Sequence, residues 1–580
     1  MEAKLFSLSD PYGAAPTLPP FKQAVSTGVA WNQQSITRND TLGQLLDQAI
    51  ARCGPQDCLV YADRDFRLTW TEFGSLVDQM ARGLMALGVQ RNEKIALWAT
   101  NVPHWIPLMF ATAKIGAILL PLNTNYRSTE IDFALRQSET ENLFLIDGFR
   151  NTDYLQTLYD LIPELKTQPR GALKIPRYPH LKRLFFLGPE KRRGIYSLNE
   201  LLALAVQTPQ ADYEARQREL NCHDIVNMQY TSGTTGFPKA VQLSHSNIAN
   251  DGFWIGACQN LSSVDRVCIP VPLFHCFGCV LGVMACVNHG STMVLLEKYD
   301  PVLVMMSIEK ERCTACYGVP TMYIAILDHP LFSKFSYDSL RTGLMAGAPC
   351  PEKRMRQLFD LMNMTEVSNA YGLTEAGPVM SQTRYFEKDM RNKCKTIGQA
   401  LPGIEVAIVN PETGALCEVE QPGEICCRGY NTMKGYYKLP EQTAACIDAN
   451  GWLHSGDIGH MDENGYFYIT GRLKDLIIRG GENISPKEVE DFISHLEGVQ
   501  DIQLVGVPSS KYGEQPAAFI IRMPGSEITE ADVEDYCRNK IAWFKIPKFI
   551  HFIESFPLTA SGKIQKFKLR ELAVQLWPDA

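Results

Sequence analysis

One ten-residue segment combines the side chains that bind phosphate. It reads Tyr230-Thr231-Ser232-Gly233-Thr234-Thr235-Gly236-Phe237-Pro238-Lys239, with apolar residues on either side. Glycine lets backbone N–H groups point toward a ligand, hydroxyls donate to oxygen atoms, and lysine neutralises charge. A solvated Ser/Thr turn is the simpler alternative, but the density of these residue types favours a phosphate-binding loop. It is not a Walker A loop, because Pro238 rather than glycine precedes Lys239.

Four shorter motifs follow this segment along the chain. They are Tyr371-Gly372-Leu373-Thr374-Glu375, Gly451-Trp452-Leu453-His454-Ser455-Gly456-Asp457, Gly471-Arg472-Leu473-Lys474-Asp475 and Pro557-Leu558-Thr559-Ala560-Ser561-Gly562-Lys563. Each alone is a weak signal, since Asp457 could simply precede a β-turn and Lys563 could be an ordinary surface lysine. No two glycines lie two positions apart, which excludes the dinucleotide fingerprint G-x-G-x-x-G.

Taken in this order, the five motifs resemble those of the adenylate-forming superfamily of acyl-CoA synthetases, luciferases and peptide-synthetase adenylation domains. The resemblance covers roughly residues 40–575 and is strongest to the medium-chain fatty acyl-CoA synthetase subgroup. It implies a two-step ligase that uses ATP, Mg²⁺ and coenzyme A. A carboxylate attacks the α-phosphate of ATP, which gives acyl-AMP and pyrophosphate. The CoA thiol then attacks the acyl carbon and releases AMP.

The resemblance also implies which residues hold the nucleotide. Asp457 accepts from the ribose hydroxyls and Arg472 joins it, while Thr374 donates to the α-phosphate and Glu375 is the Mg²⁺ ligand. The other implied positions are Thr231, Ser232, Gly233, Thr234, Thr235, Gly236 and Lys239 in the phosphate loop, Gly347, Ala348 and Pro349 as the small-residue wall of the adenine slot, and Asn369, Ala370, Tyr371 and Gly372 beside the base.

The last two motifs are expected to supply a catalytic cation and a hinge. Joining two anions requires positive charge between them, and the resemblance assigns that charge to Lys563. Lys474 occupies the hinge about which a C-terminal domain rotates between the two steps. Gly480 and Gly481 then let the pantetheine arm of CoA pass close to the backbone. Luciferase-like members place a lysine where this chain has Ile478, so the CoA contacts stay open.

The acid substrate is expected to be apolar. Residues 272–281 lack the Asp or Glu that amino-acid-adenylating members use, and burying an ammonium group without a partner costs several kcal/mol. We expect an acyl tunnel built from parts of 274–284 and 317–323. The resemblance implies a medium-chain fatty acid, and a chain of about six to ten carbons would gain ample binding energy at about 0.8 kcal/mol for each buried CH₂. His275 is either a catalytic gate beside the acyl carbonyl or a core histidine.

The amino-acid composition bears on whether the protein binds nucleic acid and on the cellular compartment in which it works. The 580 residues carry a net charge of -8, without the basic excess of a duplex-binding protein. Seventeen cysteines scattered through apolar runs, and no apparent signal peptide, favour buried thiols and a cytoplasmic location. Two CxxC pairs, Cys276–Cys279 and Cys313–Cys316, leave a zinc site as the less favoured alternative. The uncharged run 267–296 contains prolines and glycines, so we expect strands and a short helix there and no integral membrane span.

The elements that must position these residues alternate along the chain. Helices are expected after Asp40-Thr41 and after Leu68-Thr69, and strands over 94–98 and 117–120. This order predicts an α/β fold with a large N-terminal domain of parallel-sheet subdomains. After about residue 395, short strands broken by Pro-Gly and Asn-Gly predict a small β-barrel-like subdomain. A small, mobile α+β domain follows, whose first helix opens with a capping box at Ser485–Glu488 and runs through Leu496.

The expected domains are an N-terminal arm over 1–38, an adenylate-forming domain over 39–471 with its β-rich part at about 395–471, and a C-terminal domain over 472–580. The runner-up function is an acyl- or aryl-acid adenylating ligase with another acceptor, such as a carrier protein. A non-enzymatic binding protein is the third alternative. The oligomeric state stays open, a homo-oligomer included.

Overall fold

The computed structural model describes residues 20–30, 37–231, 238–348, 350–479, 482–509, 511–538, 540–559 and 563–578. The chain divides into two compact units. The first contains Thr27–Val406 and Cys427–Leu453, and the second contains Pro19–Ser26, Ala407–Cys426 and His454–Ala580. Ser232 to Gly236, Pro349, Gly480 and Gly481 lie outside the described residues. The domain limits expected from the sequence, with a hinge near Lys474, stay predictions.

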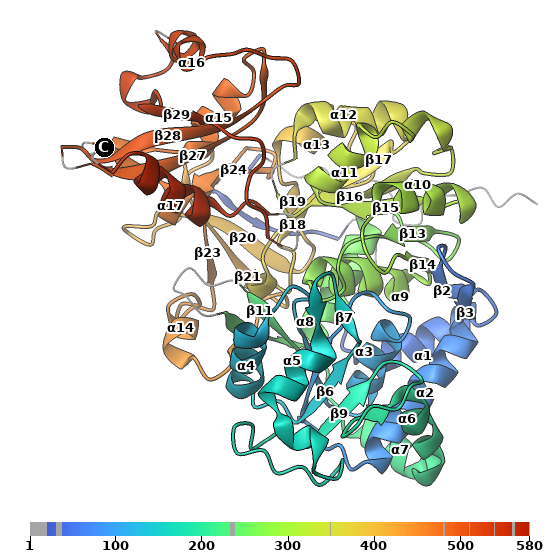
Figure 1. The fold of residues 1–580 in the computed structure, drawn as a ribbon. Coiled ribbons are helices and arrows are strands. Elements are labelled where there is room, and N and C mark those ends of the chain that lie inside the picture. Colours follow the sequence, from blue (N-terminus) through green and yellow to red (C-terminus); the bar gives the residue numbers. More distant parts are fainter. Residues whose placement is uncertain are drawn as a thin grey trace, which may run out of the picture. The chain divides into compact units, whose positions relative to one another are not determined.

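An eight-stranded sheet forms one core of the first unit (Figure 1). Its strands from β10 to β11 run parallel, and β12 is antiparallel to both of its neighbours, β11 and β22. In spatial order the strands are β10 (Tyr196–Ser197), β9 (Arg183–Phe186), β6 (Asn142–Leu145), β4 (Lys94–Trp98), β5 (Ile118–Pro121), β11 (Ile225–Thr231), β12 (Lys239–Ser244) and β22 (Gly435–Tyr436).

A nine-stranded sheet forms the second core of this unit. Its six inner strands are parallel, while β3 at one edge and β18 and β19 at the other are antiparallel. The order is β19 (Gln399–Ala400), β18 (Ser381–Gln382), β17 (Glu366–Tyr371), β16 (Thr342–Ala346), β15 (Ala315–Gly318), β13 (Arg266–Ile269), β14 (Thr292–Leu295), β2 (Asp57–Tyr61) and β3 (Phe66–Thr69). The predicted α/β class is therefore confirmed.

Helices pack on both sheets, and the first two show why the sequence forms them. Thr41 and Thr69 each complete a capping box, and the buried residues that follow keep helical spacing. The helices of this unit are α1 (Leu42–Cys53), α2 (Trp70–Ala86), α3 (Trp105–Lys114), α4 (Ser128–Gln137), α5 (Tyr154–Leu161), α6 (Leu198–Leu204), α7 (Gln210–Arg218), α8 (His245–Ala257), α9 (Ala285–His289), α10 (Pro301–Lys310), α11 (Pro320–Leu327), α12 (Glu352–Leu361), α13 (Met390–Lys395) and α14 (Pro440–Ala444).

The uncharged run over 267–296 folds as strand, loop, helix and strand. β13 leads into η3 (Phe277–Met284), a π-helix that is buried throughout, and α9 then ends at Gly290 before β14. The sequence predicted the helix but not its wider winding. Within the described residues, no helix is both long enough and apolar enough to cross a bilayer.

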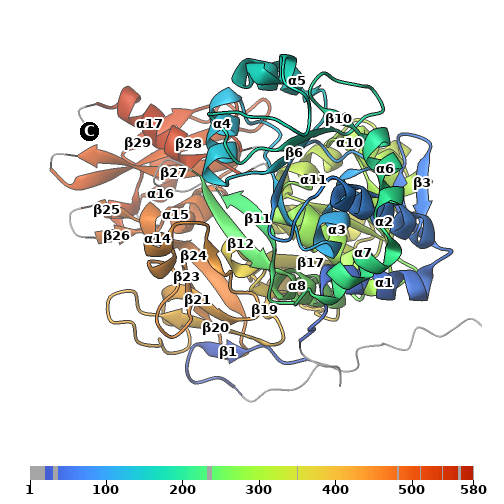
Figure 2. The ribbon, with the colours of Figure 1, turned by 90° about the horizontal axis from the view of Figure 1, so that it is seen from below.

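The second unit contains most of a five-stranded sheet and all of another (Figure 2). The first has the order β1 (Val25–Thr27), β20 (Ile404–Val409), β21 (Gly423–Gly429), β23 (Leu453–Met461) and β24 (Phe467–Arg472). The second joins β26 (Glu482–Ile484), β25 (Ile477–Arg479), β28 (Gly513–Arg522), β27 (Val499–Ser509) and β29 (Phe549–Phe552), and packs with α15 (Pro486–Ile493), α16 (Glu530–Cys537) and α17 (Lys566–Leu576).

One cap of this unit differs from expectation. Ser485 precedes α15, but its side chain makes no capping hydrogen bond to the helix, so the capping-box prediction is wrong. The Ser485 hydroxyl instead donates to the Thr470 carbonyl on β24. The helix ends at Ile493, one turn before the predicted Leu496. The Ser485 hydroxyl, on which the predicted capping box depends, is therefore engaged in a tertiary hydrogen bond.

Candidate functional site

The two ends of the predicted phosphate loop meet in the eight-stranded sheet. β11 ends at Thr231 and β12 begins at Lys239, and these two residues face each other in the antiparallel register. The hydroxyl and the ammonium therefore flank a short connection between neighbouring strands. The sequence supplies this connection with glycines and hydroxyls, which suits an anion at the same edge of the sheet.

Glu375 receives two hydroxyl groups beside that loop. Thr231 Oγ1 donates to Glu375 Oε1 at 3.3 Å, and the Tyr436 hydroxyl donates to the same oxygen at 2.9 Å. Burial, and then the neighbouring Glu375 carboxylate, raise the pKa of Tyr436 far above its usual range, so the phenol keeps its proton. Lys239 Nζ lies 4.8 Å from the centre of the Tyr436 ring. Four elements, β11, β12, β22 and the 3₁₀ turn η5 (Thr374–Ala376), thus gather a cation, a carboxylate and two hydroxyls.

The surroundings of the Glu375 carboxylate leave it suited to bind a hard divalent cation. Both of its side-chain hydrogen bonds come from neutral hydroxyls, and no described Lys or Arg forms an ion pair with it. A carboxylate oxygen of this kind is the ligand that Mg²⁺ takes in phosphate sites.

The predicted adenine segments lie at the carboxyl edge of the nine-stranded sheet. Met345 pairs with Asn369 and Ala346 with Ala370, so Gly347-Ala348 and Tyr371-Gly372 leave adjacent parallel strands at the same edge. Ligands of open α/β sheets bind outside this edge. Asn369 itself is engaged in the fold, because its amide donates to the Thr396 carbonyl at 2.9 Å.

The segments predicted to line the acyl tunnel reach the same edge. A Cβ added to Gly347 would lie 3.4 Å from Val319 Cγ1 and 4.0 Å from Phe277 Cδ1. Phe277 in turn approaches Tyr317, with 6.2 Å between ring centres. The structure therefore brings 274–284 and 317–323 together with the proposed adenine wall.

His275 joins this edge through Cys276. His275 Nδ1 accepts the backbone N–H of Phe277 at 3.2 Å and lies 3.6 Å from Cys276 Sγ. The same sulfur lies 3.7 Å from Thr374 Oγ1. The imidazole, the thiol and the hydroxyl therefore form a contiguous row. The sequence analysis named His275 and Thr374 as site residues, but Cys276 only as a member of a CxxC pair.

In the second unit, Asp457 and Arg472 form the predicted pair. They face each other in the register of β23 and β24, and Arg472 Nε donates to Asp457 Oδ1 at 2.7 Å. The Asp457 side chain is 9% exposed and that of Arg472 is 53% exposed. The backbone N–H of Asp457 also donates to Ser455 Oγ at 3.0 Å, which closes the turn before it. A carboxylate held in this way can accept hydrogen bonds from the hydroxyl groups of a sugar.

The remaining predicted residues that the structure describes lie in the same unit, and both predicted lysines are exposed. Lys474 is exposed in the 3₁₀ turn η6 (Leu473–Asp475). The Lys563 carbonyl accepts from the Thr559 N–H at 2.7 Å, and the Lys563 N–H donates to Thr559 Oγ1 at 3.0 Å. Ile478 is 53% exposed, while Arg479 donates to the Phe544 carbonyl and stacks on Tyr512 and Trp543.

All 17 cysteines are free thiols, and 15 of them are buried, which matches the favoured interpretation of the composition. Within the described residues, one group of side chains could hold a metal ion by its geometry: Glu424, Cys426 and His454. Neither CxxC pair belongs to it.

The sequence analysis missed Tyr436 altogether, and it considered Cys276 only as a buried thiol or a zinc ligand. Tyr436 lies in Lys434-Gly435-Tyr436-Tyr437, where a glycine before two tyrosines is the available signal. Cys276 is adjacent to His275, but nothing in the sequence predicts its approach to Thr374.

Comparison with known proteins gives consistent matches. Residues 46–437 match the family model described as AMP-binding enzyme, and residues 488–563 match its C-terminal domain. The Bacillus subtilis (strain 168) protein that carries the name acyl-CoA synthetase YngI is 46% identical over 539 residues, covering 93% of this chain and 98% of the relative. A mitochondrial protein of Bos taurus named medium-chain acyl-CoA ligase ACSF2 is 38% identical and covers 92% and 87%. ATP-bound MatB from Rhodopseudomonas palustris superposes with a TM-score of 0.80 at 26% identity, covering 92% and 99% of the two chains.

Proposed function

The chain belongs to the AMP-binding enzyme family, and we propose that it is an ATP-dependent, AMP-forming acyl-CoA ligase that prefers medium-chain fatty acids. In the first step the fatty carboxylate attacks the α-phosphate and pyrophosphate leaves. In the second step the CoA sulfur attacks the acyl carbon, the thiol gives up its proton, and AMP leaves. The arrangement of Thr231, Lys239, Tyr436 and Glu375 at one loop is the observation that carries the proposal.

The first unit supplies the phosphate and metal groups. Lys239 and the phosphate loop hold the polyphosphate, and Glu375 holds Mg²⁺, which offsets negative charge on the phosphates when bound. Tyr436 keeps the Glu375 carboxylate oriented through a hydroxyl that stays protonated. Thr374 is assigned to the α-phosphate and His275 to the acyl carbonyl, with Cys276 between them. Gly347, Ala348 and Tyr371 border the adenine.

The second unit supplies the ribose contacts and the catalytic cation. Asp457 accepts from the ribose hydroxyls, and Arg472 holds the carboxylate in place. Lys563 bridges the carboxylate and α-phosphate oxygens during adenylation, and rotation about Lys474 withdraws it before thioester formation. The exposed Lys474 turn and the exposed Lys563 turn are compatible with these roles.

The residues expected to line the acyl tunnel support an uncharged acid. Residues 267–296 contain no Asp, Glu, Lys or Arg, and η3 is buried throughout, so a charged tail would lose its hydration without gaining a partner. A tail of about six to ten carbons gains enough from burial to bind. The name of the Bos taurus relative also supports medium-chain acids.

The test is to incubate the protein with MgATP and octanoate, with and without CoA. CoA-dependent release of AMP supports the proposal. Pyrophosphate release without a thioester would instead favour a ligase that uses another acceptor. The absence of both pyrophosphate and thioester would contradict an enzymatic role. A panel of acids from acetate to palmitate, with benzoate, then measures kcat/KM against chain length. A maximum at benzoate or at palmitate would contradict the medium-chain assignment.

A further inference from the structure

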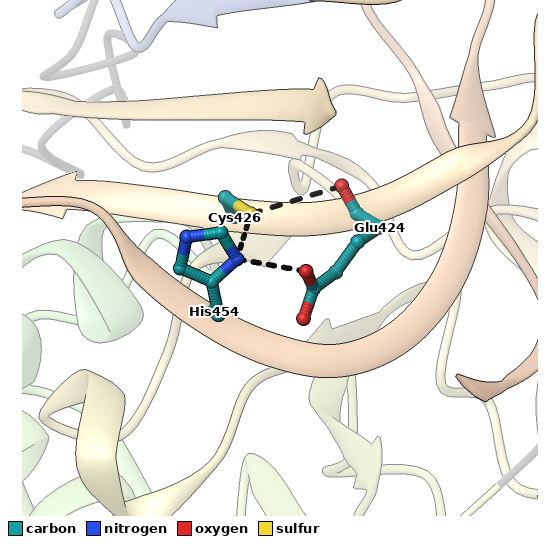
Figure 3. A group of neighbouring side chains, drawn as sticks. All are labelled: Glu424, Cys426 and His454. Carbon is teal, nitrogen blue, oxygen red and sulfur yellow. Dashed lines mark hydrogen bonds and ion pairs between the residues drawn. The ribbon is translucent and has the colours of Figure 1, made fainter. Parts of the chain in front are cut away.

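Three different metal-ligand side chains to which the proposed function gives no role meet on one face of the five-stranded sheet, near the turn that precedes Asp457. Glu424 and Cys426 lie two positions apart on β21, so they point to the same face. His454 comes from β23, the neighbouring strand in that sheet. Figure 3 shows the carboxylate and the sulfur turned toward the imidazole.

The ligand atoms are already close enough to share one ion. His454 Nδ1 lies 2.7 Å from Glu424 Oε2 and 3.4 Å from Cys426 Sγ. One ligand atom from each of the three residues lies within 4.8 Å of the other two. The other carboxylate oxygen, Glu424 Oε1, accepts the Gly456 N–H at 2.9 Å, which fixes the orientation of the carboxylate from outside the cluster.

The charge and exposure of the cluster also suit a cation. The Glu424 side chain is 9% exposed, and His454 is its partner for an ion pair. Cys426 is fully buried, whereas a third of the His454 side chain is exposed and opens a path for an ion and a water. A buried carboxylate needs compensating charge, and a metal ion would supply it when the thiol and the imidazole lose their protons.

From this geometry we infer that Glu424, Cys426 and His454 form a Zn²⁺ site with three protein ligands and an open fourth position. Sulfur, imidazole nitrogen and carboxylate oxygen are the donors that Zn²⁺ takes in tetrahedral sites. Mg²⁺ and Ca²⁺ take oxygen donors, so the site is distinct in chemistry from Glu375. Because Glu424 also holds Gly456, the ion would tie the two strands together next to the turn that ends at Asp457.

Co²⁺ is the probe of choice, because it occupies Zn²⁺ sites and its spectrum reports a bound thiolate. The full-length, metal-free protein is titrated with Co²⁺. We expect one equivalent to bind with a thiolate-to-cobalt charge-transfer band, and Zn²⁺ to displace it and to raise the Tm. Cys426→Ser should abolish the band, and His454→Gln should weaken binding at least tenfold. Cys427→Ser is the matched control, because Cys427 is equally buried on the same strand but faces the other way.

Two outcomes would overturn the inference. One is a wild-type spectrum without the thiolate band, which would leave the cluster as a hydrogen-bonded triad. The other is a band that survives Cys426→Ser, which would place the ion on another cysteine. If circular dichroism shows that Cys426→Ser fails to fold, His454→Gln decides in its place, because a third of that side chain is exposed. An unchanged Co²⁺ affinity in that variant would equally refute the site.

Discussion

Removing the Tyr436 hydroxyl tests whether that residue positions the metal-binding carboxylate. Tyr436→Phe keeps the ring that lies 4.8 Å from Lys239 Nζ and deletes only the donor 2.9 Å from Glu375 Oε1. A hydrogen bond to a charged group contributes about 1.5–3 kcal/mol. If that energy is used in the first step, kcat/KM for MgATP should fall about 10- to 150-fold.

The neighbouring residue offers a matched control. The Tyr437 hydroxyl donates to Glu139 Oε2, also at 2.9 Å, so Tyr437→Phe deletes the same type of bond from a carboxylate that has no assigned role in catalysis. The assay is pyrophosphate exchange with octanoate at several Mg²⁺ concentrations. We expect Tyr436→Phe to require more Mg²⁺ and Tyr437→Phe to behave as wild type. An unchanged Mg²⁺ dependence in Tyr436→Phe, or equal losses in both variants, would refute the assigned role.

Three further predictions concern other residues. Lys563→Ala should lower the adenylation rate about 10²- to 10³-fold but spare thioester formation from supplied acyl-AMP. Lys568→Ala is the control, because Lys568 is also exposed. Equal loss of both half-reactions would contradict the assignment. Lys474→Pro should do the converse by restricting the hinge, and survival of both half-rates would show that the hinge lies elsewhere. Burial lowers the pKa of His245 and of His289 to about 4, so both stay neutral in the fold while the unfolded chain protonates near pH 6.5. The free energy of unfolding is thus unaffected by these two histidines above that pH, and it decreases as the pH falls toward 4, by about 2 kcal/mol for each histidine at pH 5. Urea unfolding at several pH values should show this decrease, and His289→Gln should have a shallower pH dependence.

The sequence was most informative where one segment determines its own structure. Apolar spacing and the threonine caps predicted α1 and α2 closely, and strand alternation predicted the parallel sheets. The approach of Gly347 to Phe277 and Val319 was implied only by the order of strands, since adjacent parallel strands deliver their following loops to one edge.

The misses share a different cause. The Ser485 hydroxyl bonds to Thr470, Tyr436 reaches Glu375 and Cys276 approaches Thr374, and each contact joins segments that are distant in sequence or in different elements. Local propensity carries no information about such partners. The cluster of Glu424, Cys426 and His454 is likewise formed by strand pairing and not by a spacing motif.

The π-helix η3 divides its surface between a fixed side and a variable side. A Cβ on Gly278 would lie 2.4 Å from the Pro272 carbonyl oxygen, and one on Gly282 would lie 3.0 Å from Ile269 Cγ2. These glycines therefore let the helix pack closely against the strand and loop that precede it: a Cβ at Gly278 would clash with the backbone, and one at Gly282 would require Ile269 to shift. The larger side chains of the helix, such as Phe277, do not take part in this close contact. In the proposed acyl tunnel, exchanges of residues on the opposite side would change the acid preference, while Gly278 and Gly282 keep the helix in place.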